Sequence, residues 1–78
     1  MKVVGYRKSA FTGNDGSEVV GYNLYCLEPL EKGEGMAAER FFLTSEKLRN
    51  CGYEPNLGDE VQMSYNRYGK VAQIVKVG

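Results

Sequence analysis

Aromatic side chains with basic neighbours recur along this chain of 78 residues. Rings that stack on bases and cations that contact phosphates are the groups that hold single-stranded nucleic acid, and each stacked base contributes roughly 1–3 kcal/mol. The pattern therefore predicts a surface suited to such a ligand. The candidate groups are Tyr6 with Arg7 and Lys8; Tyr22 and Tyr25; Arg40 with Phe42; and Arg67 and Tyr68 with Lys70.

Several of these side chains have a competing interpretation. Tyr22 shares an alternating pattern with apolar residues, which favours a place in the core. Arg40 stands in the middle of a predicted strand, where it either contacts a ligand or pairs with an acid across the sheet. Tyr68 lies beside Arg67 in a predicted tight turn, where one small domain can hardly bury a ring. We therefore expect Tyr68 to be the ring that contacts a ligand.

Groups that catalyse reactions or bind metals are scarce in this sequence. There is no His, and therefore neither the commonest general base nor the commonest metal ligand. Gly33 and Gly35 lie in a predicted loop rather than ahead of a helix, so they do not form a phosphate-binding loop. The spacing of Cys26 and Cys51 matches no metal motif. We expect no enzymatic activity, no cofactor and no metal.

The net charge is zero, but the charges are unevenly distributed. Residues 12–60 carry all ten acids and only four of the ten cations. The other six cations lie in residues 1–11 and 61–78, which contain no acid. If the two ends lie side by side, the molecule has a basic face.

The length predicts one small domain, residues 1–78. No apolar run approaches the roughly 18 residues that a membrane span needs, and no secretory segment is recognisable at the N-terminus. We expect a cytoplasmic protein without membrane contact and with reduced thiols. A disulfide between Cys26 and Cys51 is the alternative.

Alternation and turn residues predict five strands and one helix. Thr44, Ser45 and Glu46 are typical of a helix start, and Gly52 is typical of a helix end. Leu48 and Cys51 would face the interior. The predicted strands are residues 2–11, 18–28, 37–43, 60–65 and 70–77, with the helix at 45–51.

The second predicted strand has a clear period of two. Its two faces carry different side chains, with Val20, Tyr22, Leu24 and Cys26 on one and Val19, Gly21, Asn23, Tyr25 and Leu27 on the other. Phe41 and Phe42 are adjacent in the third strand, so they point to opposite faces. A slip of one residue in the register would exchange Tyr22 and Tyr25 between core and surface.

The order β-β-β-α-β-β predicts an all-β fold with one short helix, namely a five-stranded OB-type barrel. Closure would remove the exposed edges of five short strands, and the helix would cover one end of the barrel. An SH3-like barrel is the structural alternative, but it normally lacks a helix at this position. In an OB barrel the first strand pairs with the fourth, which would bring the two basic ends together.

Several short motifs resemble the small OB-fold single-stranded DNA-binding proteins of filamentous phages, the gene V protein type. They are Phe11-Thr12 before a hairpin, Gly21-Tyr22-Asn23-Leu24, Leu57-Gly58, and Arg67-Tyr68-Gly69 in the last hairpin. The resemblance implies a homodimer that coats single strands, with Tyr22, Leu24 and Tyr68 in its DNA-binding region. The first hairpin departs from that family, because it carries Asp15 and Glu18 and no cation.

The sequence supports two functions. The first is binding of single-stranded DNA, with RNA as the alternative ligand, through Tyr6, Lys8, Tyr22, Leu24, Arg40, Arg67, Tyr68 and Lys70. The second is a protein–protein interaction or oligomerisation barrel, an accessory subunit of a phage or mobile-element complex. That barrel would use the acidic middle of the chain or a face containing Phe41 or Phe42.

Overall fold

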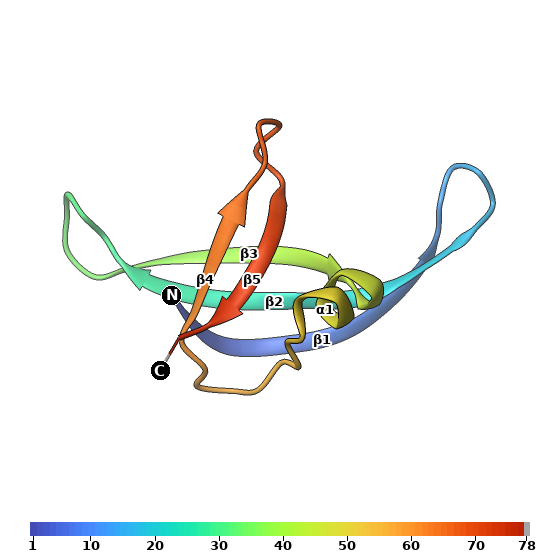
Figure 1. The fold of residues 1–78 in the computed structure, drawn as a ribbon. Helices are drawn as coiled ribbons and strands as arrows, with labels where there is room; N and C mark the ends of the chain where they lie inside the picture. Colours follow the sequence, from blue (N-terminus) through green and yellow to red (C-terminus); the bar gives the residue numbers. More distant parts are fainter. Residues whose placement is uncertain (78) are drawn as a thin grey trace.

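The computed structural model describes residues 1–77 as a β-rich domain with one short helix (Figure 1). The order of elements is the predicted one, and each strand boundary lies within one residue of its predicted position. The elements are β1 (Lys2–Thr12), β2 (Glu18–Pro29), β3 (Met36–Thr44), α1 (Ser45–Cys51), β4 (Val61–Tyr65) and β5 (Val71–Lys76).

The first three strands form an antiparallel sheet in the order β1-β2-β3. Leu24 of β2 lies opposite Tyr6 of β1 and Phe41 of β3, so these three side chains share one face. Leu24 and Cys26 are buried and Tyr22 packs against the core. The predicted alternation of β2 is therefore confirmed.

The hairpin between β1 and β2 ends in a tight turn that uses its acidic residue. Asp15 accepts hydrogen bonds from the amide and the hydroxyl of Ser17, and Gly16 takes a left-handed φ of 84°. These hydrogen bonds lower the pKa of Asp15. The acid in the first hairpin thus has a local role in shaping the turn.

The helix α1 forms where its capping residues predict it. The Thr44 hydroxyl accepts a hydrogen bond from the Lys47 amide, and Gly52 ends the helix with a left-handed φ of 68°. Leu48 is buried and Cys51 packs against the core, as predicted. Among residues 1–77, no helix combines the length and the apolar character needed to cross a lipid bilayer.

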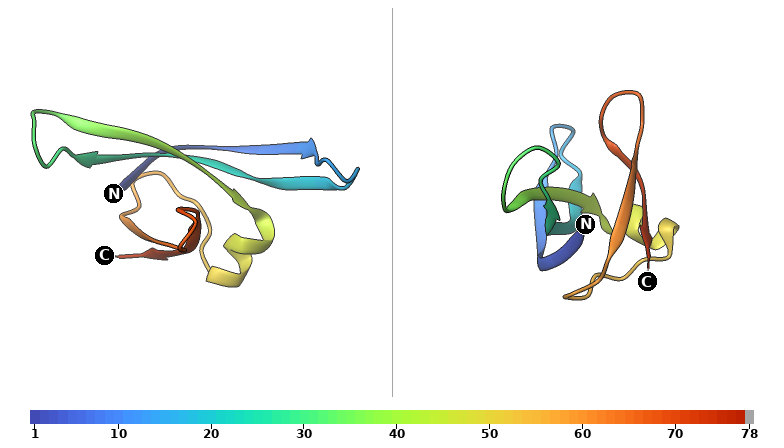
Figure 2. Two further views of the ribbon diagram at one scale, coloured as in Figure 1. Left: turned by 90° about the horizontal axis from the view of Figure 1, so that it is seen from above. Right: turned by 90° about the vertical axis from the view of Figure 1, so that its left-hand side faces the viewer.

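The core lies between the three-stranded sheet and the β4–β5 hairpin. Figure 2 shows α1 and the hairpin on the same side of the sheet. The side chains that fill this space come from every element and from the connection after α1. They are Val3, Leu24, Cys26, Leu43, Leu48, Tyr53, Val61 and Ile74.

The β4–β5 hairpin forms a separate two-stranded sheet, and the described residues do not close into a barrel. The predicted pairing of the first and fourth strands is limited to one bridge between Lys2 and Glu60. Backbone bonds next to this bridge join Val3 to Gly58 and Asp59. The hairpin is short and crosses the longer strands at a steep angle, so it meets β1 only at one end (Figure 1).

The two ends of the chain meet at this bridge, but they do not form the predicted basic face there. The Lys76 ammonium lies 3.6 Å from an Asp59 carboxylate oxygen, and the N-terminal ammonium lies 3.8 Å from one of Glu60. Acids from the middle of the chain therefore lie beside Lys76 and the N-terminal ammonium where the ends come together.

Tyr53 belongs to the core and is hydrogen-bonded to this junction. We expect it to make the stability of the fold depend on pH. Its hydroxyl donates a 2.9 Å hydrogen bond to Asp59, and burial followed by this bond raises its pKa from 10.0 to about 12. The folded state thus favours neutral Tyr53, whose contribution is complete below pH 10 and is lost as the pH rises to about 12. We expect the free energy of unfolding to fall by about 1–2 kcal/mol across this window.

Urea unfolding of the wild type and of Tyr53→Phe at several alkaline pH values checks this prediction. The variant should be less stable than the wild type at neutral pH and should show a shallower alkaline fall. An equally steep fall in both proteins would assign the effect to other groups.

Candidate nucleic-acid interface

In the part of the chain that the structure describes, one face of the three-stranded sheet has no helix or strand over it. α1 and the β4–β5 hairpin both lie on the opposite side in two perpendicular views (Figure 2). The register pairs Arg7 with Asn23 and Asn23 with Phe42, and it places Tyr25 between Gly5 and Arg40. We call this surface the outer face and define it by Arg7, Ser9, Phe11, Asn23, Tyr25, Arg40 and Phe42.

The outer face carries three aromatic rings. Phe11 and Phe42 are in contact, with ring centroids 5.5 Å apart. Phe11 is 52% exposed and Tyr25 is 38% exposed, so both rings are accessible to a ligand. The strands thus present aromatic surface to solvent at two places, which is the requirement for stacking bases.

Two glycines allow these rings to lie close to the backbone. The Tyr25 ring lies against Gly5, where an added Cβ would be 3.6 Å from it. Phe42 lies against Gly21, where an added Cβ would be only 2.8 Å from the end of the ring. Gly21 is buried, so a side chain at this position would displace the Phe42 ring.

The outer face is also free of acidic side chains. The three acids within β1–β3 are Glu18, Glu28 and Glu39, and their strand partners place all of them on the core face. Burial and then Glu39 and Glu28 raise the pKa of Tyr65 in β4, which agrees with that placement.

The two arginines of the outer face have no ion pair with any group of residues 1–77. Arg7 and Arg40 are exposed, and the salt bridges found among residues 1–77 involve only the N-terminus and Lys76 as cations. Of the two interpretations of Arg40, pairing with an acid across the sheet is therefore not observed. Both guanidinium groups are free to contact an anionic ligand.

Four of the predicted site residues lie on the opposite, core face. Leu24 is 0% exposed and belongs to the core, so its predicted contact with nucleic acid is wrong. Tyr22 is half-buried, and its ring packs edge-on against that of Tyr6 at 6.2 Å. Lys8 lies opposite Tyr22. The structure brings Tyr6, Lys8 and Tyr22 together, but not with Arg40.

The remaining predicted residues lie at the tip of the β4–β5 hairpin. Tyr68 is 72% exposed, as predicted, and the Arg67 guanidinium lies 5.1 Å from the centre of its ring. Asn66 accepts hydrogen bonds from the amides of Tyr68 and Lys70, which fixes the turn. The tip projects beyond the β3 edge of the sheet (Figure 1).

The predicted site is thus divided among three surfaces, and the outer face combines two arginines with three aromatic rings. The pattern of aromatic and basic residues in the sequence includes Arg7, Tyr25 and Phe42, which are not among the predicted site residues. Phe11 and Asn23 lie outside that pattern. Cross-strand pairing identifies the residues of this surface, and it can be assigned only when the register of all three strands is known.

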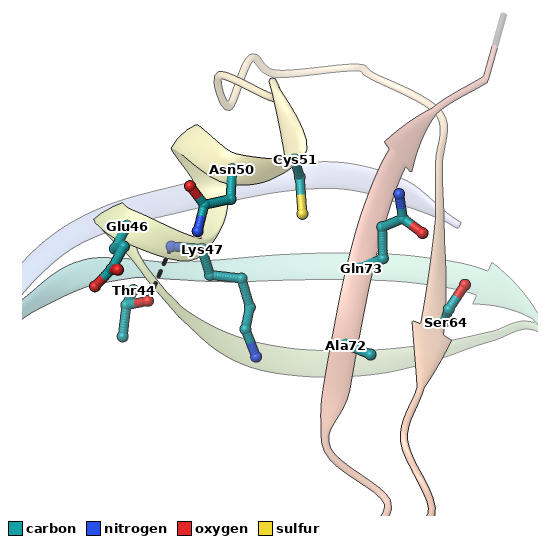
Figure 3. A pocket seen from close by; sticks show the side chains of 8 residues that line it. All are labelled: Thr44, Glu46, Lys47, Asn50, Cys51, Ser64, Ala72 and Gln73. Carbon is teal, nitrogen blue, oxygen red and sulfur yellow. Dashed lines mark hydrogen bonds between the residues drawn. The ribbon is translucent and has the colours of Figure 1, made fainter.

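A cleft of about 570 Å³ lies between α1 and the β4–β5 hairpin (Figure 3). The Lys47 ammonium donates a 2.5 Å hydrogen bond to the Val71 carbonyl oxygen. One of its N–H donors is therefore already used within the protein. No three His, Cys, Asp or Glu side chains of residues 1–77 gather as metal ligands, here or elsewhere. The cleft is lined by Thr44, Glu46, Lys47, Asn50, Cys51, Ser64, Ala72 and Gln73.

Comparison with known proteins gives no family assignment. No protein-family model, curated protein or solved structure matches this chain.

Proposed function

We propose that this chain is an OB-type module that binds single-stranded nucleic acid, DNA in the first instance, through its outer face. The observation that carries the proposal is the composition of that face, where two unpaired arginines flank exposed aromatic rings and no acid is present. Bases would stack on Tyr25 and on the Phe11–Phe42 pair. Arg7 and Arg40 would contact phosphates.

The strand order and the bridge between Lys2 and Glu60 support the OB-type arrangement. The bridge places β4 beside the start of β1, and α1 follows β3, as in that fold. OB folds bind oligonucleotides on the face of their second and third strands and with the adjacent loops. Tyr25, Phe42 and Arg40 lie on β2 and β3, and the Tyr68 tip belongs to the loop between β4 and β5.

A titration with labelled oligonucleotides at two salt concentrations tests the proposal. Single-stranded DNA should bind more tightly than duplex, because paired bases cannot stack on the rings. The affinity should fall with salt, because cations on the protein displace counterions from the strand. The affinity for RNA of the same sequence shows whether DNA or RNA is the preferred ligand. No binding at low salt, or an affinity that salt does not change, would refute the proposal.

We expect the hairpin tip to make a second, smaller contribution to the binding of single-stranded DNA. Replacing Tyr68 by Ala should weaken binding by about fivefold, which corresponds to the lower end of roughly 1–3 kcal/mol for one stacked base. Replacing Arg67 should reduce the salt dependence. The same titration measures both variants, with Leu57→Ala as a control at another exposed apolar residue. Unchanged affinity in Tyr68→Ala would remove the tip from the interface.

A second copy of the chain is the competing occupant of the outer face, since Phe11, Phe42 and Tyr25 expose apolar surface. Sedimentation of the wild type and of Phe42→Ala separates the two functions. If the rings form a dimer interface, Phe42→Ala changes the mass of the protein in solution. If the rings bind nucleic acid, Phe42→Ala changes the affinity for oligonucleotides and leaves the mass unaltered.

A further inference from the structure

Asn23 occupies the centre of the outer face. Arg7 of β1 and Phe42 of β3 are its cross-strand partners, and Tyr25 is the next residue of β2 on the same side. Its Nδ2 atom donates a 2.9 Å hydrogen bond to the Ser9 hydroxyl oxygen. Asn is uncommon within strands because its amide competes with the backbone for hydrogen bonds, so its presence at this point is notable.

The hydrogen-bonding capacity of Asn23 is only partly used. Its amide has two N–H donors and one acceptor oxygen, and one N–H is taken by Ser9. Among residues 1–77, no partner is found for the Oδ1 atom or for the second N–H. No side-chain nitrogen or oxygen of these residues is both buried and unpaired, so the unpaired Oδ1 atom of Asn23 is not fully buried.

Ser9 holds the amide in place. The bond to Ser9 restrains the side chain of Asn23, and the Ser9 hydroxyl keeps its own hydrogen available for a ligand. Both residues are half-buried within the sheet. An amide that is restrained in this way presents an acceptor and a donor side by side at a fixed orientation between two places where rings can stack.

We propose that Asn23, positioned by Ser9, reads the hydrogen-bonding edge of one base and gives the outer face a preference for adenine. This proposal rests on the proposed function. The Oδ1 atom would accept from the exocyclic amino group of adenine, and the free N–H would donate to a neighbouring ring nitrogen, the pairing that Asn makes with this base. A purine also offers the larger surface for stacking on Tyr25 or Phe42.

The test compares oligo(dA), oligo(dC) and oligo(dT) of equal length in fluorescence titrations. The wild type should prefer oligo(dA) to oligo(dT) by about fivefold or more, the lower end of the discrimination expected from one bidentate pair. Asn23→Thr should abolish this preference. Thr favours strands, so the fold should be kept, and circular dichroism checks this.

Two further variants test whether Ser9 positions Asn23. Ser9→Ala should reduce the preference while the Asn23 side chain remains, and Asn14→Ala, in the turn at residues 13–17, should leave it intact. If every oligonucleotide binds but the wild type shows no preference, or Asn23→Thr retains one, the inference fails and the proposed function stands. If no oligonucleotide binds the wild type, both fail.

Discussion

Replacing Arg7 and Arg40 together by Gln will weaken the binding of single-stranded DNA on the order of 30-fold at low salt. Each exposed guanidinium contributes roughly 1 kcal/mol to a charged contact, and the two act at separate phosphates. The salt dependence should become shallower as well. The logarithmic slope falls by roughly 0.7 for each phosphate contact that is lost on a single strand, so it should change by about 1.4.

The double variant Lys32→Gln and Arg49→Gln is the matched control. It also removes two exposed cations and changes the net charge equally, but Lys32 lies in the loop after β2 and Arg49 lies on α1. We expect it to bind with an affinity within about twofold of the wild type. Equal losses in the two double variants would show that net charge, and not the outer face, determines the affinity.

Replacing Gly21 by Ala will destabilise the fold by about 1–3 kcal/mol, a large part of the stability of a domain of this size. Gly21 is buried where β2 and β3 approach closely. An added Cβ would collide with the Leu43 carbonyl oxygen and would lie 2.9 Å from the Thr44 Cα atom. Both of these contacts are with backbone, which cannot move aside as a side chain can.

Urea unfolding measures the effect, with Gly33→Ala as the control. An added Cβ at Gly33 would meet only the Leu30 side chain, at 3.6 Å, and its φ is not left-handed, so we expect a change within about 0.5 kcal/mol. If Gly21→Ala unfolds at the same urea concentration as the wild type, β2 and β3 are not as close as described. The ring of Phe42 would then also lie differently.

The strands and the helix could be predicted because their signals are local. The hydroxyl of Thr44 and the left-handed Gly52 define α1 within a few residues, and the alternation around Leu24 defines the buried face of β2 without knowledge of its partners. The exposure of Tyr68 also follows from its own turn. Each of these features depends on residues that are close in sequence.

The candidate site could not be predicted in full because it depends on pairing between distant segments. Arg7, Asn23 and Phe42 come together only through the register of three strands. The short motif around Leu24 predicts that it belongs to the site, although its alternation with Cys26 indicates the core. The extent of barrel closure depends on the angle between two sheets, for which neighbouring residues carry no signal.

A map of backbone amide chemical shifts during titration with a short single-stranded oligonucleotide tests most directly whether the outer face is the interface. We expect the largest changes at Arg7, Asn23, Tyr25, Arg40 and Phe42, with smaller ones at the hairpin tip and none in the cleft beside α1. Changes that leave the outer face unaffected, whether they fall in the cleft or at the tip alone, would contradict the proposed interface.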